Sequence, residues 1–181
     1  MVFKEKGFAA TTVDDIGRRA KMDRATVYYY FTGKKELFRE MVNEATNENV
    51  NMAERIAGLE QPPRKKLRGL IEGLLQSYVK HYPYLYVYVQ EDMVRLTKDG
   101  SGWGKQMIAL NHRFDQAVFK IVQEGLSSGD FVSNRDPRLI TAGIIGMCNW
   151  THRWFDPTGQ LSSTELARVF AELVLDGLLP R

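Results

Sequence analysis

The feature that most constrains this chain is the spacing of its apolar residues, which is helical along almost its whole length. Leu67, Leu70, Ile71 and Leu74 recur at intervals of three and four residues, the pattern of an amphipathic helix. The segment YLYVYV alternates as a strand does, but we see no second strand or hairpin turn with which it could pair. We therefore expect a buried helix there and an all-α fold.

Capping residues mark where these helices begin and end. Thr12 with Asp15, and Ser162 with Glu165, have the spacing of capping boxes. Asp136-Pro137 places a capping acid before a proline in the first helical turn. The expected helices run through 12–19, 24–31, 34–57 (capped by Thr32), 67–79, 108–122, 137–155 and 162–179, with a loop at 100–104 that holds Trp103.

The first forty residues predict a helix-turn-helix, because two short helices flank the turn Lys21-Met22-Asp23. Successive helical residues step by about 100°, so placing Val27 and Phe31 inward turns Ala25 and Tyr29 outward. The remaining positions follow from this choice: Ile16 and Ala20 form the inward stripe of the preceding helix, Met22 fills the corner, and Arg24, Thr26, Tyr28 and Tyr30 lie on the flanks.

The excess positive charge lies in the same segment. The net charge of the chain is +3, and residues 1–40 hold nine Lys and Arg against six acids, while the charges of residues 41–181 balance. Tyrosine hydroxyls suit phosphate oxygens, and the first turn that carries Lys34 and Lys35 also favours a phosphate. We expect DNA binding. The alternative is a helical hairpin whose exposed tyrosines and lysines only keep it soluble.

Residues 3–42 resemble the DNA-binding signature of the TetR family of bacterial repressors. GFAATTVDD and ATVYYYFTGKKELF carry the likeness: a Gly-aromatic pair ends helix one, Thr-Val opens helix two, and a tyrosine block covers helix three. The resemblance implies a DNA-binding domain at 1–45, with a first helix that looks truncated, and a ligand-binding and dimerisation domain at 46–181. The DNA contacts that it implies are Thr12 as the helix cap, Arg24, Ala25, Thr26 and Tyr29 in the groove, and Tyr28, Tyr30 and Lys34 on phosphates.

TetR-family members bind semi-palindromic operators as dimers through their last two long helices, so the resemblance also implies a homodimer. The sequence agrees, because two apolar stripes lie on the final helices, and Gly143 and Gly146 allow close packing of backbones. The alternative is that these stripes only build the core of the protomer. The expected dimer residues are Ile140, Ile144, Leu166, Val169, Phe170, Leu173 and Val174.

The middle helices concentrate aromatic rings among a few polar groups, which predicts a cavity for a mostly apolar effector. Arginines at its mouth would hold an anionic group. The alternative is a core in which the tyrosines turn their hydroxyls to water. The expected ligand residues are Tyr78, Tyr82, Tyr86, Gln90, Arg95, Trp103, Arg113, Phe114, Met147, Trp150 and Arg153.

NWTHRWFDPTGQLS and YVYVQEDMVRL resemble the branch of the family that senses acyl-CoA thioesters and controls lipid or sterol breakdown. The resemblance implies an acyl-CoA-like effector whose phosphate meets Arg95, Arg113 or Arg153. The function that we expect is a ligand-responsive repressor that binds double-stranded operator DNA. The alternative is a DNA-binding regulator without a small-molecule effector, controlled by a protein partner.

Other classes of function find little support in the sequence. The single cysteine, Cys148, excludes a disulfide scaffold, and the three histidines share no metal-ligand spacing with it. No nucleophile-base pair or glycine-rich phosphate loop indicates an enzyme, and nothing calls for a cofactor. No segment predicts a membrane span or secretion, so we expect a cytoplasmic protein that does not bind membranes.

Overall fold

The computed structural model describes residues 2, 5–6, 10–90 and 101–178, and every element assigned in this part of the chain is helical. This confirms the all-α prediction, including a helix over YLYVYV. The helices are α2 (Val13–Ala20), α3 (Arg24–Tyr30), α4 (Lys34–Ala57), α5 (Pro63–Lys80), α6 (Tyr84–Gln90), α8 (Gly102–Ser128), α9 (Pro137–Trp150), the 3₁₀ turn η1 (Thr151–Arg153) and α10 (Ser163–Leu178).

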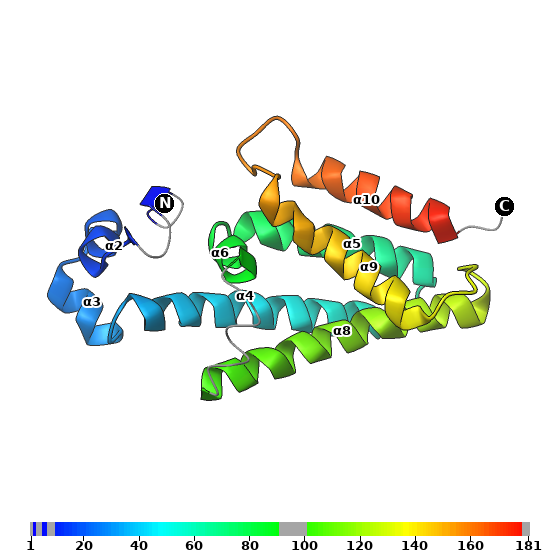
Figure 1. Cartoon of the computed structure of the whole chain (residues 1–181), viewed down its shortest axis with the longest axis horizontal. Coiled ribbons are helices and arrows are strands. Elements are labelled where there is room, and N and C mark those ends of the chain that lie inside the picture. The colour runs from blue at the N-terminus through cyan, green and yellow to red at the C-terminus, as the bar shows by residue number, and fades with distance from the viewer. Residues whose placement is uncertain (1, 3–4, 7–9, 91–100, 179–181) are drawn as a thin grey trace.

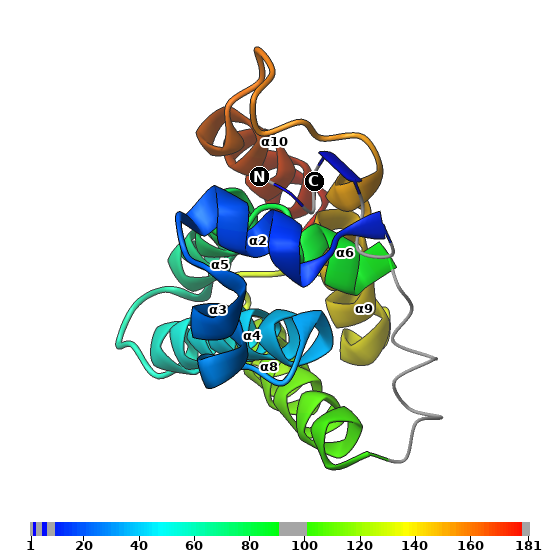
Figure 2. The ribbon, with the colours of Figure 1, turned by 90° about the vertical axis from the view of Figure 1, so that its left-hand side faces the viewer.

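The two short helices α2 and α3 form one end of an elongated molecule (Figure 1). From that end α4 runs along the rest of the protein, and it packs against α5 and α8. In turn α10 packs on α5, while α9 packs on α8. Viewed from the end, α2 and α3 stand in front of the larger helical body (Figure 2). The long helix α4 is therefore the element that connects the two parts.

The core lies between α4, α5, α8 and α10 and is made mostly of aliphatic side chains. Among the described residues, the buried charged side chain is Lys66. Its Nζ donates to both carboxylate oxygens of Glu124, at 2.9 and 2.8 Å, and to the Ala57 carbonyl at 3.3 Å. These three bonds satisfy an ammonium group that burial would otherwise destabilise. They also join the end of α4, the start of α5 and the last third of α8.

Several helix boundaries differ from those that we expected. Trp103 lies in the first turn of α8 and not in a loop, because Ser101 caps the helix by accepting a hydrogen bond from the Gly104 amide at 3.2 Å. The helix expected at 137–155 ends at Trp150 and continues as η1. Thr32 does not cap α4; its backbone and hydroxyl groups both donate to the Glu36 carboxylate.

In the described part of the chain, no helix is long and apolar enough to cross a membrane.

Candidate DNA-binding interface and effector cavity

Local capping fixes α2 and its turn. The Thr12 hydroxyl accepts from the Asp15 amide at 3.1 Å, and the Asp15 carboxylate accepts from the Thr12 amide at 3.1 Å, so the predicted capping box is present. Lys21 ends the helix in the left-handed conformation, with φ of 56°. The turn then comes so close to Gly17 that a Cβ there would lie 2.8 Å from the Met22 carbonyl oxygen. Glycine is therefore required at this position.

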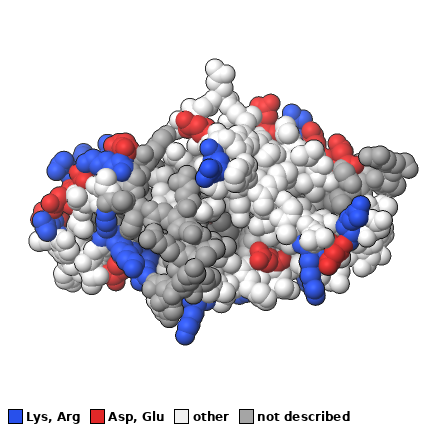
Figure 3. Space-filling model, viewed as in Figure 1, with Lys and Arg blue, Asp and Glu red and all other residues white. Residues whose placement is uncertain are grey.

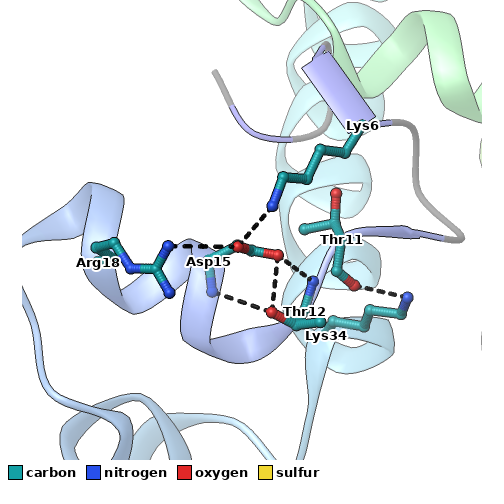
Figure 4. A network of polar contacts seen from close by, with 6 residues as sticks. All are labelled: Lys6, Thr11, Thr12, Asp15, Arg18 and Lys34. Atoms are coloured by element: carbon teal, nitrogen blue, oxygen red, sulfur yellow. Dashed lines mark hydrogen bonds and ion pairs between the residues drawn. The ribbon is translucent and has the colours of Figure 1, made fainter.

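Asp15 is the centre of a polar network at the base of α2 (Figure 4). Lys6 donates to its carboxylate at 2.8 Å, and the Thr12 hydroxyl also donates to it at 2.8 Å. The Lys6 bond, followed by the two Thr12 bonds, lowers the pKa of Asp15 well below its ordinary range. Asp15 is therefore ionised at neutral pH and holds the entry of the chain into α2.

The second short helix presents its tyrosines to solvent. Asp23 caps α3 by accepting from the Thr26 amide at 2.6 Å, and Val27 is buried beneath the helix. Tyr29 is 82% exposed, Tyr30 63% and Tyr28 43%. Ala25 is exposed as well, as the predicted orientation of α3 requires. One face of this helix is therefore exposed to solvent and carries three tyrosine rings.

The expected inward residues are only partly correct. Val27 is buried and Phe31 and Ile16 are half-buried, but Ala20 is exposed. Its place in the contact between α2 and α3 is taken by Gly17, which is buried against the turn and Val27. Met22 is 38% exposed and does not fill the corner.

Positive side chains gather around this end of the molecule (Figure 3). Arg18, Arg19, Lys21 and Lys35 are exposed there. Arg24 is exposed too, although it pairs with Asp14 at 3.4 Å and lies 5.3 Å from the centre of the Tyr28 ring. These charges lie on α2, on α3 and at the start of α4, the same end of the molecule as the exposed tyrosines. A concentration of positive charge of this kind attracts a polyanion.

Lys34 is placed differently from the other lysines. The residue is half-buried, and its Nζ donates to the Thr11 carbonyl at 2.7 Å, which ties the first turn of α4 to the residue before the α2 cap (Figure 4). Lys35, in the same turn, is exposed. Lys34 therefore has a positioning role within the domain, and its contact with phosphate stays a prediction.

A cavity of about 620 Å³ lies between α4, α5, α6, α8 and α9. We call it the effector cavity. Thr46, Asn49 and Val50 contribute the α4 wall, Leu74 and Tyr78 the α5 wall, and Leu85, Tyr88 and Val89 the α6 wall. The remaining lining comes from α8, at Asn111, Phe114, Asp115, Gln116 and Phe119, and from α9, at Arg138, Thr141, Ala142, Ile145, Gly146 and Asn149.

Hydrogen bonds between helices organise the polar groups of this cavity. The Tyr78 hydroxyl donates to the Asn149 side-chain oxygen, and the Asn111 amide donates to the Tyr88 hydroxyl at 3.1 Å. Loss of water contact raises the pKa of the Tyr88 phenol, and it also raises the pKa of the Asp115 carboxyl. The cavity therefore combines apolar walls with amide and hydroxyl groups that can orient a ligand.

Two regions of the chain match two family models. Residues 1–41 match the model described as bacterial regulatory proteins, tetR family, and residues 60–178 match the tetracyclin repressor-like C-terminal domain. The chain belongs to the TetR family. It is therefore a helix-turn-helix transcriptional regulator. Helix α4 begins inside the first matched region and covers most of the interval before the second.

Individual TetR-family relatives cover nearly the whole chain at low identity. The HTH-type transcriptional repressor KstR2 of Mycolicibacterium smegmatis is 23% identical over 98% of this chain and 85% of its own. The structure of the ketosteroid transcriptional regulator KstR2 of Mycobacterium tuberculosis has a TM-score of 0.87 at 22% identity, covering 99% of this chain and 90% of that one. AibR, in complex with isovaleryl coenzyme A and operator DNA, has a TM-score of 0.71 at 16% identity, with 94% and 90% covered.

Only part of the predicted ligand set lines the effector cavity of this TetR-family protein. Tyr78 and Phe114 do. Arg113 instead makes a double ion pair with Glu54, at 2.9 and 2.8 Å, and Trp103 donates to Asn43 at 2.9 Å. Tyr82, Met147, Trp150 and Arg153 are not among the lining residues, and Arg153 lies 5.3 Å from the Trp150 ring centre on the surface. Arg95 and the side chains of Tyr86 and Gln90 lie outside the described residues.

Sequence reasoning missed Arg138 as the cation of the cavity. Of the described residues, it is the one Lys or Arg among those that line it. Its position just inside α9, two residues after the Asp136 cap, made it look like an ordinary helix-start residue. A helical stripe from Arg138 through Ile145 to Asn149 was the available signal, because these residues share one face of α9.

The predicted dimer residues divide between the core and the surface. Ile144 and Leu166 are only 4% and 3% exposed, so they build the core of the protomer and cannot form an outer face. Val169 and Leu173 are exposed on α10. Ile140, Phe170 and Val174 are half-buried.

On α9 the exposed stripe is shifted from the predicted one. It consists of Leu139, Gly143 and Trp150, and Leu139 is 68% exposed. A Cβ at Gly143 would meet nothing within 4 Å. Within the described residues of the protomer, two apolar stripes are thus exposed to solvent, one on α9 and one on α10 with Val169 and Leu173.

Proposed function

We propose that this protein is a TetR-type repressor that binds a semi-palindromic operator as a homodimer and is released by an elongated, mostly apolar effector. One observation carries the proposal: the helix that supports the DNA-binding end also forms a wall of the effector cavity. Lys34 ties the start of α4 to Thr11, and Thr46, Asn49 and Val50 of the same helix line the cavity.

On DNA, α3 enters the major groove. Ala25, Thr26 and Tyr29 then face base edges, with Arg24 beside them, while Tyr28 and Tyr30 reach the phosphates on either side. Thr12, the cap of α2, lies next to the sugar-phosphate backbone of the DNA. The exposed lysines and arginines around this face support the mode, because most of the affinity for a duplex comes from its phosphates.

The homodimer uses the exposed stripes of α9 and α10. Leu139 and Leu173 are large apolar side chains left in solvent, and Gly143 permits close approach of a second backbone. Pairing of two copies would bury these groups and set two α3 helices about one DNA turn apart, the spacing of successive major grooves. We expect the protein to act in the cytoplasm, where operator DNA is, and to catalyse no reaction.

The shape and polarity of the cavity define the effector. Arg138 and Asn149 are eleven residues apart on α9, which places them about 16 Å from each other along the helix. The lining as a whole is largely apolar, with Val50, Phe114 and Ile145 among its residues. The effector is then a long apolar body with a polar group at each end.

A sterol-derived acid has this form, and an acyl-CoA thioester shares its apolar body and one polar end. In either case the anionic group would lie at Arg138 rather than at Arg113 or Arg153. The name of KstR2 mentions a ketosteroid, and AibR binds isovaleryl coenzyme A; both are consistent with such an effector. We propose control of lipid or sterol catabolism on this basis. The presence of a lined cavity favours a small-molecule effector over control by a protein partner.

Release follows from two states of the dimer. The unliganded dimer holds its α3 helices at operator spacing, and an effector that prefers a second arrangement of the cavity walls swings α4 and changes that spacing. The loss of operator affinity is limited to the effector's preference for the second state.

Binding to selected operator DNA tests the proposal. Operator sequences are recovered from a random duplex library with the purified protein, and affinity is measured by gel shift at several salt concentrations. Tyr29→Ala should lower operator affinity at least tenfold while the protein remains a dimer. A thermal-shift series of acyl-CoAs and sterol acids should raise the melting temperature and release the operator. If no duplex is selected, the proposed repressor function is wrong. If only other apolar compounds bind, the proposed effector class is wrong.

A further inference from the structure

Trp103, at the start of α8, contacts α4 through two different interactions. Its indole N–H donates to the Asn43 side-chain oxygen at 2.9 Å. The guanidinium of Arg39 lies 4.9 Å from the centre of its ring, within the range of a cation–π interaction. Arg39 and Asn43 are one turn apart on the same face of α4, so a single side chain holds that face from both ends.

Trp103 also contacts the wall of the effector cavity. The ring of Tyr88 stands edge-on to it, with 6.3 Å between ring centres and 77° between planes. Tyr88 is buried, lines the cavity, and accepts a hydrogen bond from Asn111, which lines it too. A ligand that displaces either residue must move or release the ring packed against Trp103.

The α4 contacts of Trp103 lie close to the DNA-binding end. Arg39 and Asn43 are five and nine residues after Lys34, which is about 7 and 14 Å along the helix from the bond to Thr11. The ion pairs that hold α4 elsewhere, Glu48 with Lys80 and Glu54 with Arg113, lie farther toward its other end. Of these three sets of contacts on α4, the one made by Trp103 therefore lies nearest to α2 and α3.

We propose that Trp103 couples the effector cavity to the DNA-binding domain, passing displacement of Tyr88 to Arg39 and Asn43 on α4. This inference rests on the proposed function, of which it names the regulatory connection. Tyr88, Trp103 and Asn43 form one continuous set of contacts from the cavity wall to the helix that carries α3. Trp103 is a positioning residue, and it touches neither the effector nor DNA.

A double-mutant cycle on operator affinity, measured without any effector, tests this coupling. Trp103→Leu removes both α4 contacts and should weaken operator binding at least fivefold. Tyr88→Leu should weaken it at least threefold in the wild-type background. The operator affinity of the double variant should differ less than twofold from that of Trp103→Leu alone, because the effect of Tyr88 passes through Trp103. The inference is overturned if the fold-changes multiply, or if either single variant binds the operator as the wild type does.

Phe114→Leu is the matched control, because Phe114 lines the cavity but makes none of these contacts. Its effect on operator affinity should be the same with and without Trp103. If the leucine variants melt too low to be assayed, the pair Trp103→Phe and Asn43→Leu replaces them. Each substitution removes the same indole–amide hydrogen bond, so the double variant should bind the operator about as weakly as the weaker single variant. If the two fold-changes in operator affinity multiply instead, the coupling is overturned.

A second measurement separates this inference from the proposed function. Decanoyl-CoA should release the operator from the wild type and fail to do so from Trp103→Phe while still raising its melting temperature. If decanoyl-CoA releases the operator from both proteins at the same concentration, the coupling is overturned, while the proposed repressor function still holds. If decanoyl-CoA binds neither protein, the acyl-CoA proposal fails, and the effector-free cycle still decides the role of Trp103.

Discussion

The ammonium group of Lys34 donates a 2.7 Å hydrogen bond to the carbonyl oxygen of Thr11, joining the first turn of α4 to the residue that precedes the α2 cap. The turn between α3 and α4 and the entry to α2 are thereby held together. We therefore expect α2, α3 and the start of α4 to move together, so that a reorientation of α4 would also reorient α3.

This bond distinguishes Lys34 from its neighbour Lys35 in a measurable way. Lys35→Gln should lower operator affinity modestly and reduce the salt slope by about one, as expected for a residue that only meets phosphate. Lys34→Gln should lower affinity about tenfold more, because a charge-assisted hydrogen bond within the domain is also lost. Gel shifts at four salt concentrations give both quantities. Equal losses for the two variants would show that the Thr11 bond does not position α3.

The capping carboxylate makes the DNA-binding end sensitive to acid. Because the pKa of folded Asp15 lies below its ordinary value of 3.8, ionised Asp15 stabilises the fold above pH 3.8, and this contribution is lost as the pH falls through the folded pKa. Asp15→Asn should therefore lower the melting temperature at pH 6, and its difference from the wild type should shrink below pH 3.8. Circular dichroism melts measure this. A difference that is constant from pH 6 to pH 3 would contradict it.

Arg138 should decide the affinity for an anionic effector. Arg138→Gln should weaken acyl-CoA binding about tenfold, the cost of one charge-assisted hydrogen bond, and leave uncharged apolar ligands within twofold of the wild type. Arg113→Gln is the control, since Arg113 pairs with Glu54 outside the cavity. Titration calorimetry measures all three proteins. Should Arg113→Gln prove the more damaging, the anionic group is bound elsewhere.

Leu173 should control the association of two copies. It is 64% exposed on α10, so a glutamate there is tolerated by the protomer but would be buried unpaired between two protomers. Leu173→Glu should shift the protein to a monomer in sedimentation experiments and lower operator affinity at least a hundredfold. Ile108→Glu, on the exposed face of α8, should remain a dimer. A dimeric Leu173→Glu protein would place the interface on another surface.

The N-terminal half of the site was predictable because its signals are local. The Thr12–Asp15 box and the outward tyrosines of α3 depend on spacing within one or two helical turns, and both are found in the structure. The burial of Ala20 was predicted wrongly, because it depends on how closely the turn after α2 approaches that helix. That approach is set by Gly17 and the left-handed Lys21, not by apolar periodicity.

The cavity was less predictable, because its lining comes from five helices whose relative rotation the sequence does not show. Aromatic rings and arginines of the right composition were identified, but Arg113 is held by Glu54 and Trp103 by Asn43, two partners from α4 that lie about sixty residues away. Polar lining residues such as Thr46 and Asn49 were overlooked, because they are embedded in an otherwise apolar stripe of α4.

Helix α9 turns one side, with Thr141 and Asn149, toward the cavity and an adjacent side, with Leu139 and Gly143, toward solvent. Under the proposed function, the fourteen residues of α9 would serve both the binding of a small molecule and the recognition of an identical copy. Substitutions in this segment that changed the effector would then also change which homologues the protein can assemble with, so a duplicated gene could gain a new stimulus and stop forming mixed dimers with its parent in the same step.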